Sequence, residues 1–279
     1  VMVIAGKLGL YSILRFSFGI FPEQSHHIAP LLLALGAIGI VYGALLALVQ
    51  TDLKRLVAFA TLSAVAFITL GIFSFTISGI DGGIFHIVSE SLTGAAFFML
   101  LGILYERYGT YDIRQYGGVA SKLPWMVAMF VIMTLSLVGL PMLNGFVGEF
   151  LILAGSMQST VPHHIAWTVL ATSGVILSAS YMLWMIQRVF YGDLGHKPET
   201  MPARDLNARE HLAMWPLLLL FLAMGVASPF WMRAIDTAGA NLAQQSVQTI
   251  SPPTAPVDGA KDSSSPTMTS STLTATEAK

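Results

Sequence analysis

The amino-acid sequence predicts an all-α membrane protein, a polytopic bundle of seven or eight spanning helices. Of its 279 residues, 54% are hydrophobic and only 10% are charged, whereas a soluble domain carries about 25% charged residues. The mean hydropathy is +0.70, and long apolar runs recur along most of the chain. Because a chain with so little charge cannot cover a water-facing surface, we expect it to lie in a lipid bilayer.

Eight apolar segments approach the length of about 20 residues that a bilayer crossing needs. They lie at about 1–20, 29–50, 56–78, 84–105, 124–141, 145–158, 165–190 and 211–232. The link between the fifth and the sixth, Gly139 to Gly145, holds Gly, Pro and Asn, and Gly and Pro interrupt helices. It is either a tight hairpin between two crossings or the unwound middle of one broken helix.

The distribution of Lys and Arg favours one broken crossing. The basic links are 51–55, 106–123 and 188–210, and the links without Lys or Arg lie near 21–28, 79–83 and 159–164. Positive charge marks the cytoplasmic side of a membrane protein. The three basic links share one side only if 124–158 crosses the membrane once.

The two ends of the chain differ from its apolar middle. We interpret Val1 as a position within a longer protein, because Lys7 interrupts the first apolar run and no signal-peptide cleavage site follows. After about Leu242 the chain is rich in Ser, Thr, Pro and Ala, and such a segment cannot bury enough apolar area to offset its ordering entropy. We therefore predict a transmembrane domain over 1–242 and a disordered tail over 243–279.

The sequence also argues against several classes of site. It has no cysteine, which excludes disulfides, thiolate metal sites and cysteine-ligated iron–sulfur clusters. It contains no glycine-rich phosphate loop, dinucleotide fingerprint or paired-histidine metal motif. Its net charge of −1 gives no reason to expect nucleic acid as a partner. We expect this chain to bind no metal and no redox cofactor.

Ionisable residues inside the apolar runs are the candidate functional residues, because a charge at the bilayer centre costs at least about 2.5–3.5 kcal/mol. Lys7, with Arg15 eight residues later, is either a lysine that extends to the membrane interface or a mid-membrane charge. His86, Glu90 and Thr93 share one helix face by their spacing. They could relay protons, since histidine and a carboxyl group removed from water both exchange protons near neutral pH.

The alternative for that face is a polar seam that bonds to a neighbouring helix. Glu90 also lies only about six residues into its predicted span, which leaves an interfacial position open.

Glu149 follows Pro141, Asn144 and Gly148, so that a carboxylate occurs next to interrupted backbone. Discontinuous helices place ion sites near the membrane midplane in transporters. The alternative is a glutamate favoured by the dipole at a helix N-terminus, which accounts less well for the Gly, Pro and Asn residues. We therefore favour a functional Glu149.

Other charged and histidine residues are expected at the surface. Lys54 lies in a compact charged turn, and it reaches the polar interior only if the next helix begins inside the membrane boundary. Arg107 and its neighbours are interpreted as loop charges, and His26, His27, His163 and His164 as exposed residues of short links.

Four segments of the chain carry a family resemblance: 7–16, 50–56, 104–107 and, most specifically, 139–150. Over residues 1 to about 240 the sequence resembles the antiporter-like membrane subunits of proton-pumping NADH:quinone oxidoreductase (respiratory complex I), and most of all the chain M (subunit 4) type. The resemblance implies about fourteen helices in two inverted repeats, each with a broken helix. This chain would hold the second repeat and the end of the first.

The resemblance also implies roles for residues. Lys7 matches an essential lysine on the first broken helix and Glu149 an acidic residue on the second. Lys7 would load the proton pathway, and His86 and Glu90 would relay the proton. Glu149 would be the terminal site, and Lys54 is a further residue expected to take part in proton transfer. NADH, FMN, iron–sulfur clusters and quinone would belong to other subunits. The partners would be other membrane subunits and the lipid of the cell inner (plasma) membrane.

Two departures from the family pattern concern the same region. The family usually has a histidine where this chain has Glu90, and the glutamate expected to pair with Lys7 belongs to a preceding half. Lys7 is therefore expected to lack its carboxylate partner. Two alternative functions stay open: a subunit of an Mrp-type cation/proton antiporter or membrane-bound hydrogenase, and a scaffold that conducts no protons.

Overall fold

A computed structural model describes residues 2–193 and 204–236, which are helical or in loops apart from one isolated backbone bridge between Asp52 and Asp112. This confirms the predicted all-α class, whereas the tail at 243–279 lies outside the described residues. The elements are α1 (Met2–Ser12), a π-helical turn (Ile13–Ser17), α2 (Phe18–Ile20), α3 (Pro22–Leu48), α4 (Leu53–Ile72), α5 (Ile77–Tyr108), two 3-10 turns (Ile113–Gln115 and Val119–Ser121), α6 (Pro124–Leu137), α7 (Asn144–Met157), α8 (His164–Phe190) and α10 (Ala208–Val226).

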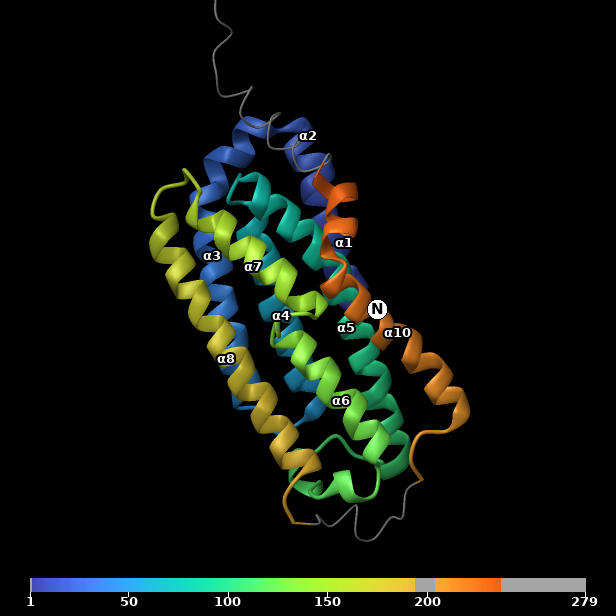
Figure 1. Ribbon diagram of the computed structural model, residues 1–279. Coiled ribbons are helices and arrows are strands. Elements are labelled where there is room, and N and C mark those ends of the chain that lie inside the picture. Colours follow the sequence, from blue (N-terminus) through green and yellow to red (C-terminus); the bar gives the residue numbers. More distant parts are fainter. Residues whose placement is uncertain (1, 194–203, 237–279) are drawn as a thin grey trace, which may run out of the picture.

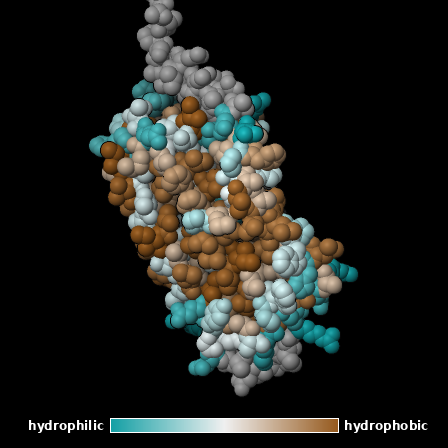
Figure 2. Space-filling model, in the orientation of Figure 1, coloured by the Kyte–Doolittle hydropathy of each residue, from teal (hydrophilic) through white to brown (hydrophobic). Residues whose placement is uncertain are grey.

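The outer surface of the bundle is that of a membrane protein. Among the described residues, α3, α4, α5, α8 and α10 are each long and apolar enough to cross a bilayer. Figure 2 shows hydrophobic residues around the middle of the molecule and hydrophilic residues gathered toward both ends. Large apolar side chains such as Leu35, Val169 and Leu219 are exposed on the spanning helices α3, α8 and α10.

Helices α6 and α7 together make one broken crossing, as predicted. Figure 1 shows α6 running from one end of the bundle to its middle and α7 continuing to the opposite end. Each has 14 residues and is therefore about 21 Å long, too short alone for a hydrocarbon core of about 30 Å. In the link between them, Gly139 and Met142 have positive φ angles of 76° and 78°.

The basic links lie at one end of the bundle, which confirms the predicted charge asymmetry in the described part of the chain (Figure 1). Two of these links pair through their backbones. The N–H of Leu53 donates to the carbonyl of Tyr111 over 2.9 Å, and the N–H of Ile113 donates to that of Thr51 over 2.9 Å. The bundle is therefore closed at this end by paired loops.

Two helices begin about seven residues earlier than predicted. Pro22 begins α3, where its fixed φ suits the first helical position, so that His26 lies inside a helix rather than in a link. Thr76 caps α5 by accepting a hydrogen bond of 3.1 Å from the N–H of Gly79. Glu90 is consequently the fourteenth residue of a 32-residue helix, near its middle, and the interfacial alternative for Glu90 is wrong.

The helix of Lys7 shows no break within the residues that the structure describes. Over residues 2–20 it is continuous, and the π-helical turn at Ile13–Ser17 adds one residue without unwinding the backbone. The N–H of Phe18 bonds the carbonyl of Ile13 across that turn. Within the described residues, the break between α6 and α7 has no counterpart in this helix.

Candidate functional site

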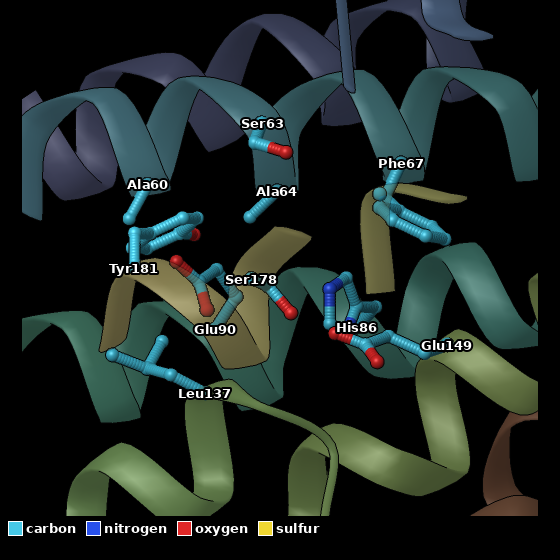
Figure 3. Close-up of a pocket in the computed structure, with 11 residues that line it drawn as sticks. Ala60, Ser63, Ala64, Phe67, His86, Glu90, Leu137, Glu149, Ser178 and Tyr181 are labelled. Carbon is cyan, nitrogen blue, oxygen red and sulfur yellow. The ribbon is translucent and has the colours of Figure 1, made fainter. Parts of the chain in front are cut away.

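Four of the predicted site residues meet inside the bundle. Lys7 comes from α1, His86 and Glu90 from α5, and Glu149 from α7. Figure 3 shows His86, Glu90 and Glu149 converging toward a space between α4, α5, α6, α7 and α8. Lys7, His86 and Glu90 are only 4%, 3% and 4% exposed, and Glu149 is half-buried. The ionisable residues therefore form one buried cluster.

Lys7 and Glu90 form an ion pair inside this cluster. The Lys7 Nζ lies 3.9 Å from the Glu90 Oε1, which is longer than a hydrogen bond. Neither atom has a hydrogen-bond partner within the part of the chain that the structure describes. Glu90 therefore provides a carboxylate partner for Lys7 within this chain, whereas the glutamate that the resemblance assigns to Lys7 is not among the described residues.

Glycines of the α6–α7 motif make room for the other two groups. A Cβ atom at Gly148 would lie 2.7 Å from the Nδ1 of His86, and one at Gly139 would collide with the carboxylate of Glu149. The imidazole ring can therefore pack against the backbone of α7 one residue before Glu149. These glycines therefore make room for the side chains of His86 and Glu149, in addition to interrupting the helix.

A small cavity lies between His86, Glu90 and Glu149. Its volume is about 20 Å³, enough for about one water molecule. It is lined by Ala60, Ser63, Ala64, Phe67, His86, Glu90, Leu137, Glu149, Gly174, Ser178 and Tyr181. Figure 3 shows Ser178 and Tyr181, both from α8, beside Glu90.

The two α8 residues were missed from the sequence. Ser178 and Tyr181 are three positions apart, so they share one face of their helix. This spacing was the available signal, but Ser and Tyr are common enough in apolar helices that the pair alone predicts nothing.

Thr93 does not join the ionisable cluster. Its hydroxyl accepts a hydrogen bond of 3.0 Å from Asn144 at the start of α7. For Thr93, therefore, the polar seam between helices is the correct interpretation.

Lys54 and Arg107 lie away from the cluster, in the basic end of the bundle. Lys54 is exposed at the start of α4, and its Nζ lies 5.8 Å from the centre of the Tyr111 ring. Arg107 is not a plain loop charge, because its Nη2 lies 2.7 Å from the Oε2 of Glu210 on α10. The structure thus separates these two cations from the buried groups.

The cluster combines an ammonium group, an imidazole and two carboxylates, each of which can take up and release a proton. A water molecule in the cavity could bridge groups that do not touch. Within residues 2–193 and 204–236, no three His, Asp or Glu side chains are placed to hold a metal ion. The arrangement is suited to proton transfer.

Comparison with known proteins gives consistent matches. Residues 1–178 match the family described as "NADH:quinone oxidoreductase/Mrp antiporter, TM". The chain is 38% identical over 239 residues to NADH-quinone oxidoreductase subunit M of Rhodobacter capsulatus, covering 85% of this chain and 46% of that one. The chain therefore spans about half the length of such curated relatives.

Solved structures share the fold. Respiratory complex I from Thermus thermophilus with bound NADH contains a chain that matches with a TM-score of 0.80 and 34% identity, covering 85% of this chain and 49% of that one. The Mrp complex from Dietzia sp. DQ12-45-1b matches with a TM-score of 0.77 and 21% identity, covering 87% of this chain and 52% of that one. At that identity the second match concerns the fold alone.

Proposed function

Because this chain belongs to the NADH:quinone oxidoreductase/Mrp antiporter transmembrane family, we propose that it acts as a proton-translocating membrane subunit of NADH:quinone oxidoreductase. The observation that carries the proposal is that His86, Glu90 and Glu149 line one water-sized cavity inside the bundle, while the buried Lys7 pairs with Glu90. Ionisable groups are expensive inside a membrane and mark ion or proton pathways.

Lys7 and Glu90 would load the pathway. While Glu90 is ionised, its charge at 3.9 Å favours the protonated form of Lys7. When Glu90 takes up a proton, that attraction is lost and Lys7 releases its own proton more readily. The pair can therefore exchange one proton for another, with no change in backbone position.

His86 and Glu149 would carry the proton onward. His86 lies one turn before Glu90 on α5 and packs against the backbone of α7 at Gly148, next to Glu149 in the chain. The cavity between Glu90, His86 and Glu149 has room for about one water molecule, and such a water could connect groups that are not in direct contact. Glu149 would be the terminal site of this chain, and the exposed Lys54 is left out of the route.

Other parts of the function would lie outside this chain. NADH, FMN, iron–sulfur clusters and quinone would be bound by partner subunits, whose electron transfer would drive the proton movement. The chain would sit in the plasma membrane, with the basic links toward the cytoplasm. An Mrp-type cation/proton antiporter is the second candidate, and 38% identity to an oxidoreductase subunit against 21% to the Mrp complex supports the first.

The experiment that tests this proposal is NADH-driven proton pumping in membrane vesicles with Glu149→Gln in the full-length protein. We expect pumping per assembled complex to fall at least about tenfold, because a proton-transfer group typically contributes about 10²- to 10⁴-fold to a rate. Glu106→Gln, at an exposed position of the basic end, is the matched control and should pump normally.

Two results would count against the proposal. Normal pumping by Glu149→Gln would reduce Glu149 to a structural residue. If the wild type itself gives no NADH-driven signal, the antiporter becomes the better candidate.

A further inference from the structure

The break between α6 and α7 is held by a single buried side chain that the proposed proton route does not use. Asn144, the first residue of α7, is fully buried. Its Nδ2 donates to the Oγ1 of Thr93 over 3.0 Å and to the carbonyl of Ser89 over 3.3 Å. Its Oδ1 accepts a hydrogen bond from the hydroxyl of Ser136 on α6. One amide therefore contacts both sides of the break and α5.

The partners of Asn144 are themselves linked. The Thr93 hydroxyl donates to the Ser89 carbonyl over 3.0 Å and lies 3.4 Å from the Ser136 hydroxyl. All four residues of this amide cluster, Ser89, Thr93, Ser136 and Asn144, are buried. Both amide donors and one acceptor site of Asn144 are thus in use, so the cluster is rigid and oriented.

Asn144 does not stabilise its own helix in the usual way. The residue before α7 is Leu143, and no side chain caps the helix start. The Asn144 amide instead makes its hydrogen bonds to α5 and α6. A buried polar side chain is unfavourable unless it is hydrogen-bonded. An apolar residue at position 144 would avoid that cost, so the start of α7 alone does not explain Asn144.

Two residues of the amide cluster lie close in sequence to Glu90 and Glu149, which take part in the proposed proton transfer. Ser89 directly precedes Glu90, and Asn144 precedes Glu149 by five residues, or about 7.5 Å along the helix. We propose that this cluster is a positioning element: it holds the broken helix against α5 and so fixes Glu149 relative to His86 and Glu90. This inference rests on the proposed proton transfer.

The separation of the groups matters because charges set each other's protonation. Glu149 is faced by His86 and Glu90 from α5 and by Tyr181 from α8, and Lys7 is paired with Glu90. A shift of α7 changes the distances from Glu149 to His86, Glu90 and Tyr181 together. Loosening the amide cluster should therefore change the pH dependence of pumping, in addition to its rate.

The test uses a pair of substitutions at Thr93 in the full-length protein, assembled in its complex in membrane vesicles. Thr93→Val keeps the shape of the side chain but removes the hydroxyl, and Thr93→Ser keeps the hydroxyl. We expect Thr93→Val and Asn144→Ala to shift the midpoint of the pH profile of NADH-driven pumping by about half a unit or more, and Thr93→Ser to keep the wild-type profile.

Ser159→Ala is the matched control for the loss of a buried hydrogen bond. Its hydroxyl donates to the carbonyl of Ser74 over 2.7 Å, away from the break. It should lower stability without moving the pH profile. If Asn144→Ala fails to assemble, Thr93→Val decides.

An unchanged profile in Thr93→Val, or an equal shift in Ser159→Ala, would overturn the positioning role. Glu149→Gln, measured in parallel, separates the two proposals. If Glu149→Gln stops pumping while Thr93→Val leaves the profile unchanged, only the positioning role fails. If Glu149→Gln pumps normally, the proposed function fails first.

Discussion

Two cation–glutamate pairs join distant helices of this protein, and they are built differently. Lys7 and Glu90 lie 3.9 Å apart, with side chains 4% and 5% exposed, and the paired atoms have no hydrogen bond within the described residues. Arg107 and Glu210 lie 2.7 Å apart, with side chains 11% and 18% exposed.

The Arg107 pair belongs to a saturated network. Its guanidinium also donates to the carbonyls of Ile103, Arg204 and Asp205. Glu210 accepts a further bond from the N–H of Asn207, with which it forms a capping box. This network joins the end of α5 to the start of α10.

The contrast separates a structural pair from an exchangeable one. A charge fixed by several hydrogen bonds holds its protonation state and its position. A buried pair without such bonds gives little net stability, because its desolvation cost offsets the attraction. The second kind leaves both groups available to gain or lose a proton, which is what the proposed function needs.

The largest expected effect on stability comes from the saturated pair. Arg107→Met should lower the free energy of unfolding by about 1–3 kcal/mol, because Glu210 and several carbonyls lose their hydrogen-bond donor. Arg107→Lys should recover part of the loss, since an ammonium group cannot reproduce the guanidinium fork. Thermal unfolding of the solubilised full-length protein measures both. A loss below about 1 kcal/mol would remove the contrast.

The exchangeable pair should behave in the opposite way. Lys7→Met should reduce NADH-driven pumping at least about tenfold, while the free energy of unfolding changes by about 1 kcal/mol or less, because Glu90 can take up a proton when its partner is lost. Pumping and unfolding are measured on the same preparations. A stability loss as large as that of Arg107→Met would make Lys7 a structural residue.

Double-mutant cycles sharpen the comparison further. The cycle of Arg107→Met with Glu210→Gln should give a coupling energy of about 2–3 kcal/mol, and that of Lys7→Met with Glu90→Gln about 1 kcal/mol. Both are read from unfolding free energies. Equal coupling energies would show that hydrogen-bond saturation does not distinguish the pairs.

The smallest effect is expected at Lys54. Its side chain is exposed, and its contact with the Tyr111 ring is worth about 0.5–1 kcal/mol at such a site. Lys54→Gln should therefore leave pumping within about twofold of wild type. A tenfold loss of pumping would return Lys54 to the proton route.

Much of the fold could be predicted because lipid imposes length and charge rules on the sequence. The apolar runs predicted the spanning helices. The distribution of Lys and Arg predicted that α6 and α7 together cross the membrane once. Helix starts were less predictable. The first turns of α5 contain Asp81 and three glycines, which read as a loop, and the cap at Thr76 carries no apolar signal.

The residues of the site could be predicted from the sequence, but the contacts between them could not. Lys7, His86, Glu90 and Glu149 stood out because each is costly in an apolar run. Their pairing could not be inferred, since Lys7 and Glu90 are joined by packing between α1 and α5 and not by spacing. For Arg107, its contact with Glu210 could not be inferred either, because the two residues are 103 positions apart in the chain.

The position of the basic links at one end also bears on how the chain is made. The links at the opposite end, at Phe21, 73–76 and 158–163, are short and contain no Lys or Arg. During biosynthesis these are the segments that must be carried through the bilayer, where a charged side chain costs the most. The same asymmetry that orients the finished bundle therefore also lowers the barrier to its insertion, one hairpin at a time.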